Sequence, residues 1–145
     1  MSLDTTEEFR NDLAKLQVRI TDTLAGYDEI LKEAEPEIEP LMQRFTQAHQ
    51  QHEAELSERL RSHGCAPDTD GSSFSLVQRA VIKTRAVFDD MDDDILHAVV
   101  RGEERIVRLY DDALNTAQTA EDTALLQMQR EQVTDLLDEA RRLSD

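Results

Sequence analysis

The sequence predicts an all-α fold of the four-helix-bundle type. The chain is rich in good helix formers, it holds only 4 Gly, 3 Pro and no Trp, and its apolar residues recur at steps of three or four. Aromatic residues make up 4% of it, whereas β-sandwiches and barrels are rich in turns and aromatic residues. Because 145 residues fit one domain, we assign residues 1–145 to a single helical bundle.

The first helix is predicted over residues 5–35. Its apolar side chains form one stripe, which consists of Phe9, Leu13, Leu16, Ile20, Leu24, Tyr27 and Leu31. Pro36 and Pro40 follow, and each proline forces the preceding residue out of the α region. Acidic residues such as Asp22 and Asp28 lie off the stripe. We therefore expect this helix to present no clear carboxylate to the core.

The second helix is predicted over residues 38–63. Pro40 suits its first turn, and Gly64 suits its C-terminal cap. Its inward face consists of Leu41, Phe45, Ala48, His52, Leu56 and Leu60. A shorter helix is predicted over residues 74–88, after a loop that contains Gly, Pro and Ser.

Two more long helices are predicted, over residues 93–117 and 120–143. Their inward faces consist of Ile95, Val99, Ile106, Leu109, Tyr110 and Ala113 in the first, and of Leu126, Val133, Leu136, Leu137 and Ala140 in the second. Five aspartates crowd residues 89–94. They lack the spaced ligands, central Gly and terminal Glu of a calcium-binding loop, so we interpret them as complementing the positive N-terminal end of a helix.

The lengths of the connections predict the topology. The first two long helices are joined tightly, as are the last two, so each pair should form an antiparallel hairpin. The stretch over residues 64–92 is long enough to travel the length of the bundle. One long crossover in a four-helix bundle is the ferritin-like arrangement, and we predict that fold, with residues 74–88 as a short extra helix in the crossover. An up-down bundle with a decorated loop is the alternative.

The charge balance excludes some classes of partner. The chain has 32 Asp+Glu against 16 Lys+Arg, which gives a formal net charge of -16. Such an excess repels the phosphates of nucleic acids and anionic membrane surfaces, so we expect neither as a partner. No stretch approaches the roughly 18 apolar residues that a membrane span requires. The single cysteine, Cys65, favours a reducing compartment, and no signal peptide is visible, so we expect a cytoplasmic protein.

Several short stretches resemble a known family. They are Gly26-Tyr27; Glu55-Leu56 followed by Gly64, Pro67 and Gly71-Ser72; Arg79 after Gln78; and Arg101-Gly102-Glu103 followed by Tyr110 and Ala113-Leu114. In this order and spacing they resemble the bacterial domain-of-unknown-function family DUF2383. The resemblance implies a ferritin-like fold and a metal-binding ancestry, without an established activity.

The chain departs from that family at positions where metal ligands or packing aromatics are typical. Gln78 stands where family members tend to have His, and Val81 stands where they have Trp. Leu137 replaces a frequent His of the last helix, and Val100 replaces an acidic residue. These replacements favour a metal site that has decayed.

Four residues are the candidate metal ligands: His49, His52, Glu55 and Glu103. His52 points to the centre of the second helix's apolar stripe, with His49 and Glu55 at its flanks. Glu103 flanks the next stripe, and we expect the neighbouring Gly102 to let another helix approach. A buried carboxylate needs a partner. For Glu103 we favour Arg130 over a metal ion.

A dinuclear iron centre is not expected. Such a site uses a Glu-x-x-His pair from each of two helices, and neither the second nor the last long helix contains one. Tyr27 and Tyr110 are interpreted as core aromatics whose hydroxyls find hydrogen-bond partners. Cys65 is interpreted as a free structural thiol. No catalytic residues are assigned.

Two functional hypotheses follow. The first is a non-catalytic module without a cofactor, which self-associates or binds a protein partner. Val18 and Ile30 lie off the first helix's main stripe, as do Val100 and Val107 in the third long helix, which favours a homodimer. The alternative is a protein that binds non-haem iron or another divalent metal through the four candidate ligands.

Overall fold

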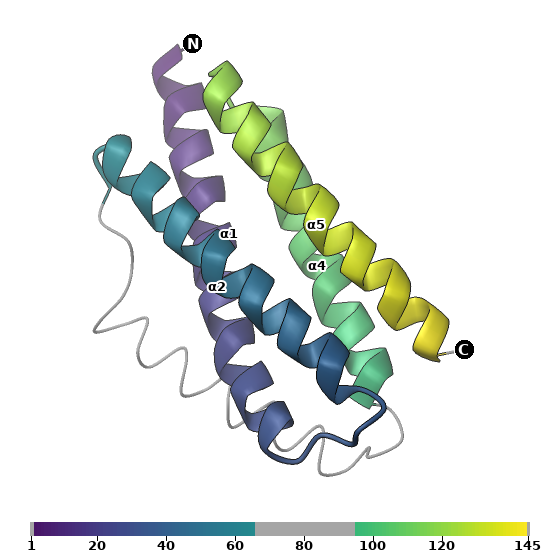
Figure 1. Cartoon of the computed structure of the whole chain (residues 1–145). Coiled ribbons are helices and arrows are strands. Elements are labelled where there is room, and N and C mark those ends of the chain that lie inside the picture. Colours follow the sequence, from purple (N-terminus) through teal and green to yellow (C-terminus); the bar gives the residue numbers. More distant parts are fainter. Residues whose placement is uncertain (1, 66–94, 145) are drawn as a thin grey trace.

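The computed structural model describes the backbone of residues 2–65 and 95–144, and the side chains of residues 6–65 and 95–144 (Figure 1). The described residues form four helices and no strand: α1 (Ser2–Lys32), α2 (Glu39–Ser62), α4 (Ile95–Thr116) and α5 (Ala120–Ser144). The prediction of an all-α four-helix bundle is therefore confirmed. The short helix predicted over residues 74–88 and the aspartates of residues 89–94 lie outside the described residues.

The helix ends follow the local chemistry that the sequence predicts. Helix α1 ends at Lys32, before Pro36, and α2 begins with Pro40 in its first turn. Gly64 follows the end of α2 with φ of +80°, in the left-handed region that favours glycine. Its backbone N–H donates to the Arg61 carbonyl at 3.0 Å, so it closes the helix as a C-terminal cap.

The helices pack so that α1 contacts α2 and α4, while α5 also contacts α2 and α4. Cys65, just after α2, packs on the apolar cluster that contains Phe9 and Leu60. Ile95, at the start of α4, packs on a different cluster, around Tyr27. These two contacts lie at opposite ends of the bundle, so α2 and α4 run in the same direction (Figure 1), as predicted. Assignment to the ferritin-like class remains a prediction.

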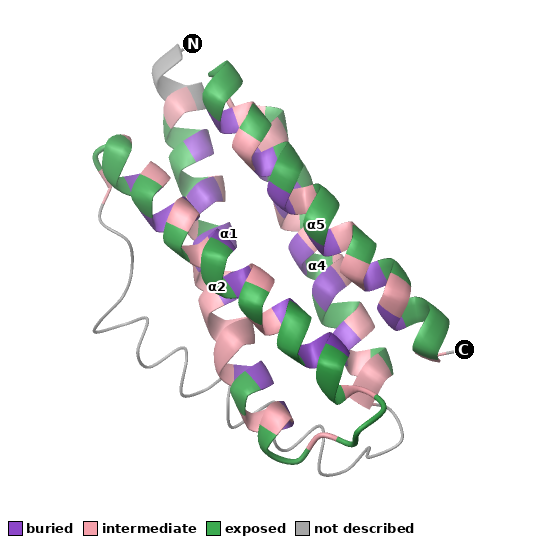
Figure 2. Cartoon of the chain, in the orientation of Figure 1, coloured by how far each residue is buried: buried purple, intermediate pink, exposed green. Residues whose placement is uncertain are grey.

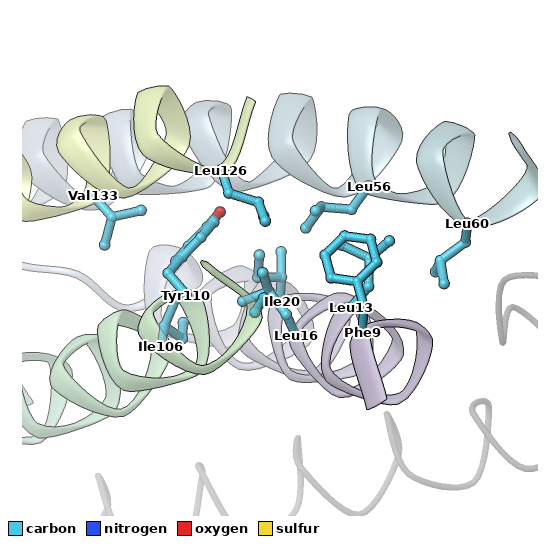
Figure 3. Packing of buried hydrophobic residues seen from close by; sticks show 11 residues of the cluster. Phe9, Leu13, Leu16, Ile20, Leu56, Leu60, Ile106, Tyr110, Leu126 and Val133 are labelled. Carbon is cyan, nitrogen blue, oxygen red and sulfur yellow. The ribbon is translucent and has the colours of Figure 1, made fainter. Parts of the chain in front are cut away.

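The core consists of two apolar clusters, and buried residues line the inner faces of all four helices (Figure 2). The first cluster is made of Phe9, Leu13, Leu16, Ile20, Leu56, Leu60, Ile106, Tyr110, Ala113, Leu126 and Val133 (Figure 3). The second is made of Tyr27, Ile30, Leu41, Met42, Phe45, Val99 and Ala140. The stripes that the sequence predicts for the four long helices supply nearly all of these residues.

Three of the four residues that were expected to lie free for a dimer partner instead contact the chain's own core. Ile30 is only 5% exposed and belongs to the second cluster. The expectation that Ile30 would be free for a partner is therefore wrong, because a one-residue offset from Leu31 still brings it within the broad buried face of α1. Val100 and Val107 are half-buried against the chain's own core, and Val18 lines a surface groove described below.

None of the helices within residues 2–65 and 95–144 combines the length and the apolar character that a membrane crossing needs.

Candidate functional site

A group of polar side chains lies at the centre of the bundle, where the two apolar clusters meet. We call it the central polar cluster, and it consists of Tyr27, His49, His52, Glu103, Tyr110 and Gln129. His49, His52, Glu103 and Gln129 are each completely buried. Buried polar groups cost free energy unless they are hydrogen-bonded. The hydrogen-bond partners of these side chains therefore show whether the cluster stabilises the fold or has atoms left to bind a ligand.

Glu103 holds the first half of the cluster together. Tyr27 Oη donates a hydrogen bond to Glu103 Oε2 across the α1–α4 interface. His49 Nε2 lies 2.9 Å from Oε2 and 3.1 Å from Oε1, so this nitrogen donates when the carboxylate is ionised. The other ring nitrogen of His49, Nδ1, is buried and has no hydrogen-bond partner among the described residues.

Two predictions about the surroundings of Glu103 are wrong. Arg130 does not pair with it; the Arg130 Nε donates instead to Asp111 Oδ1 at 2.7 Å. Both of these side chains are partly exposed, so this pair forms without desolvating the guanidinium. Gly102 is exposed, and a Cβ at that position would meet nothing within 4 Å, so none of the described helices packs closely against it.

His52 belongs to the second half of the cluster. Its Nε2 donates to the side-chain oxygen of Gln132 at 2.6 Å, and its Nδ1 lies 3.5 Å from Tyr110 Oη. Tyr110 donates to Gln129 Oε1 at 2.9 Å, and Gln129 Nε2 donates to Glu55 Oε1 at 2.9 Å. The predicted hydrogen-bond partners of the two tyrosine hydroxyls are thus present.

The pKa shifts in the cluster keep its hydrogen-bond donors in place. Burial, reinforced by the nearby charge of Glu103, raises the pKa of Tyr27 well above 10.0, so the hydroxyl stays protonated. Burial, with smaller contributions from Glu103 and Glu55, does the same to the pKa of Tyr110. Burial lowers the pKa of His52 below 6.5, against the opposing effect of its hydrogen bond to Gln132. His52 is therefore a neutral imidazole near pH 7.

The structure brings the four predicted site residues into one region but divides them between two hydrogen-bonded groups. His49 contacts Glu103, whereas His52 and Glu55 connect to Tyr110 and Gln129. The two imidazole rings meet edge to face, with centroids 6.1 Å apart. Within the described ranges, no group of three or more His, Cys, Asp or Glu side chains is arranged to hold a metal ion.

Sequence reasoning missed the roles of Gln129 and Gln132. Gln129 is completely buried between Leu126 and Val133 on the inner stripe of α5. A polar residue three or four positions from apolar ones on the same stripe is the signal that would have found it. Gln132 is exposed, and no periodicity marks its contact with His52.

A second polar group ties the end of α2 to the start of α5. Asp122, 1% exposed, accepts hydrogen bonds from Arg59 Nε at 2.8 Å, His63 Nε2 at 2.9 Å and Thr119 Oγ1 at 2.9 Å. The Asp122 backbone N–H donates back to Thr119 Oγ1 at 3.0 Å, so Thr119 caps α5. Burial alone would raise the pKa of Asp122, but the three hydrogen bonds outweigh it and lower the pKa below 3.8.

A surface groove of about 560 Å³ runs between α1 and α4. Among the described residues it is lined by Asn11, Ala14, Lys15, Val18, Arg19, Asp22 and Leu109. Its floor is apolar, and its α1 residues form a second stripe beside the core stripe. Asp22 Oδ1 is buried there and has no hydrogen-bond partner within the described part of the chain. Burial raises the pKa of Asp22 against the opposing charge of Arg19.

The comparisons with known proteins agree with the resemblance noted in the sequence. The family model of a domain of unknown function, DUF2383, matches residues 8–116, a range that includes α2, α4 and most of α1. Neither the curated proteins nor the solved structures contain a match. Because the family model covers about three quarters of the chain, this protein belongs to the DUF2383 family.

Proposed function

We propose that this chain is a non-catalytic helical module that acts by binding another polypeptide, either a second copy or a different protein. The observation that carries the proposal is the groove between α1 and α4. Its apolar floor of Ala14, Val18 and Leu109 lies between charged side chains of both signs, namely Lys15, Arg19 and Asp22. Apolar surface bordered by charges is typical of protein interaction sites.

The proposal includes a metal site that has decayed. The residues that could serve as ligands are engaged with other side chains: Glu103 with Tyr27 and His49, and His52 with Gln132. Glu55 accepts from Gln129. Each contact gives a buried polar atom a partner inside the protein, which supports a structural role for the central polar cluster.

A photo-crosslinking experiment tests the proposed function. We expect a benzoylphenylalanine placed at Val18 to form a covalent adduct of defined mass in living cells, because a bound polypeptide would lie against this residue. The same group at Arg101, an exposed residue of α4 outside the groove, is the matched control and should give no adduct. Replacing Ala14 with Glu on the groove floor should lower the yield at position 18.

Three outcomes would contradict the proposal. The adduct at position 18 could be absent, it could be equally abundant at position 101, or it could be unaffected by Ala14→Glu. Mass spectrometry of the adduct identifies its second component as this chain or as a different protein.

A second candidate function is the binding of iron or another divalent metal. It is favoured by the fully buried carboxylate of Glu103 and by the unpartnered Nδ1 of His49, since imidazole nitrogen and carboxylate oxygen both ligate such ions. In this candidate, His49 and Glu103 would supply the ligands, with His52 and Glu55 nearby. The metal content of the purified protein decides between the two candidates.

A further inference from the structure

The α1 side of the groove has the spacing of a helix-packing face. Its residues, which we call the α1 stripe, are Asn11, Ala14, Lys15, Val18, Arg19 and Asp22. They follow one another at steps of three or four, so they lie along one side of α1. Such a stripe, about 16 Å long at 1.5 Å per residue, suits another helix lying alongside it.

The order of charges in the α1 stripe is self-complementary. Lys15 and Asp22 are two turns apart, with Val18 and Arg19 between them. If a second α1 helix lies antiparallel, with a two-fold axis between Val18 and Arg19, then Lys15 faces Asp22 of the partner subunit, and the same pair recurs on the other side. A parallel arrangement would place Lys15 against Lys15 of the partner subunit, so the charges favour the antiparallel one.

The carboxylate of Asp22 also contains an unsatisfied hydrogen-bond acceptor. Its Oδ1 is buried and finds no hydrogen-bond partner in residues 6–65 and 95–144, although Arg19 lies near enough to affect its charge state. Leaving a buried acceptor unsatisfied costs about 1–3 kcal/mol. The Asp22 side chain as a whole is half-buried at the groove, so a lysine ammonium from a second copy can donate to its carboxylate. In the same register, the half-buried Val18 would lie beside the axis, against Arg19 of the partner subunit.

We propose that the α1 stripe is the interface of a symmetric homodimer, in which Lys15 of each copy pairs with Asp22 of the partner subunit. Such an interface is isologous, the commonest arrangement among soluble oligomers. This inference rests on the proposed function, because it names a second copy of the chain as the bound polypeptide. It adds the surface, the orientation of the helices and the pairs that set their register.

The net charge of -16 opposes any association between copies of this chain. Repulsion between the two whole molecules is long-ranged and screened by salt, whereas a pair within an interface is screened less. The dimer should therefore be weakest at low ionic strength and strengthen toward physiological salt.

A charge-exchange experiment tests the interface. In analytical ultracentrifugation at tens of micromolar protein and physiological salt, we expect the unaltered chain to be a dimer. Lys15→Glu and Asp22→Lys should each weaken it at least about tenfold, because each creates two like-charge contacts across the axis. The double variant Lys15→Glu/Asp22→Lys restores opposite charges and should return the dissociation constant to within about threefold of the original.

Lys32→Glu is the matched control, because it makes the same charge change as Lys15→Glu on an exposed lysine of α1 outside the stripe. It should leave the dissociation constant within about threefold. Circular dichroism shows whether each variant keeps its helices.

The outcomes separate this inference from the proposed function. A monomeric unaltered chain overturns the dimer, while a crosslink from position 18 to a different protein would still support partner binding. If the chain is a dimer that neither single variant weakens, self-association is confirmed but the proposed interface is wrong. Weakening by both single variants without rescue in the double variant overturns the Lys15–Asp22 pairing.

Discussion

Replacing Glu103 with Ala should lower the free energy of unfolding by about 3–5 kcal/mol. The carboxylate is completely buried and accepts hydrogen bonds from Tyr27 and His49, so its removal leaves two buried donors without partners. Glu103→Gln keeps an acceptor oxygen of similar shape and should cost only about 1–2 kcal/mol. Urea unfolding followed by circular dichroism measures both changes.

The neighbouring Glu104 supplies the control. Its carboxylate is partly exposed and lies 2.9 Å from Arg141 at the surface of the α4–α5 pair. Exposed ion pairs contribute about 0–1 kcal/mol, so Glu104→Ala should lower the free energy of unfolding by no more than about 1 kcal/mol. If Glu103→Ala lowered the free energy of unfolding by as little as Glu104→Ala does, Glu103 would not be the centre of a buried hydrogen-bonded group.

Asp122→Ala should have the second largest effect, a loss of about 2–4 kcal/mol in the free energy of unfolding. The change removes the acceptor shared by Arg59, His63 and Thr119, and it weakens the cap of α5. We expect this loss to be smaller than the cost of breaking a fully buried ion pair, because the Arg59 side chain is 20% exposed and water can reach it.

Glu121→Ala is the matched control for Asp122. It removes an ion pair to the same Arg59 guanidinium, at 3.3 Å, from a side chain that is 78% exposed. Its cost should stay below about 1 kcal/mol. A loss as large as that of Asp122→Ala would show that the charge near Arg59, and not the buried hydrogen bonds, stabilises this end of the bundle.

The lowered pKa of Asp122 predicts how the stability of the folded protein depends on pH. The pKa of Asp122 lies below its ordinary 3.8 in the folded protein, so the folded state binds fewer protons than the unfolded state. The stability that Asp122 contributes is therefore fully present above its ordinary pKa of 3.8. It is lost as the pH falls through the lowered pKa of the folded protein. The difference in unfolding free energy between the original chain and Asp122→Ala should shrink across that acidic range.

The sequence predicts the fold well because helix periodicity is a local property. Near neighbours in the chain determine the stripe from Phe9 to Tyr27, the place of Pro40 in the first turn of α2 and the cap at Gly64. The structure confirms all three. The burial of Ile30 is not predictable from periodicity, because the boundary of a buried face depends on how neighbouring helices pack around it.

The candidate site is less predictable, since its contacts join residues far apart in sequence. His49, His52 and Glu103 are identified from their positions on inward faces, but the partner of Glu103 depends on the relative rotation of three helices. The charge of Arg130 favours it as the partner of Glu103, whereas the packing brings Tyr27 and His49 close to that carboxylate. Asp122 was missed because its partners lie at the ends of two different helices.

Metal analysis of protein purified without an affinity tag, after growth with added iron, tests the central claim that protein hydrogen bonds hold the central polar cluster together. We expect substoichiometric metal and an unfolding midpoint that a chelator leaves unchanged, because His49, His52 and Glu103 have side-chain partners. A stoichiometric ion that stabilises the fold, with both the ion and the stabilisation lost in Glu103→Gln, would contradict the claim and support the metal-binding candidate.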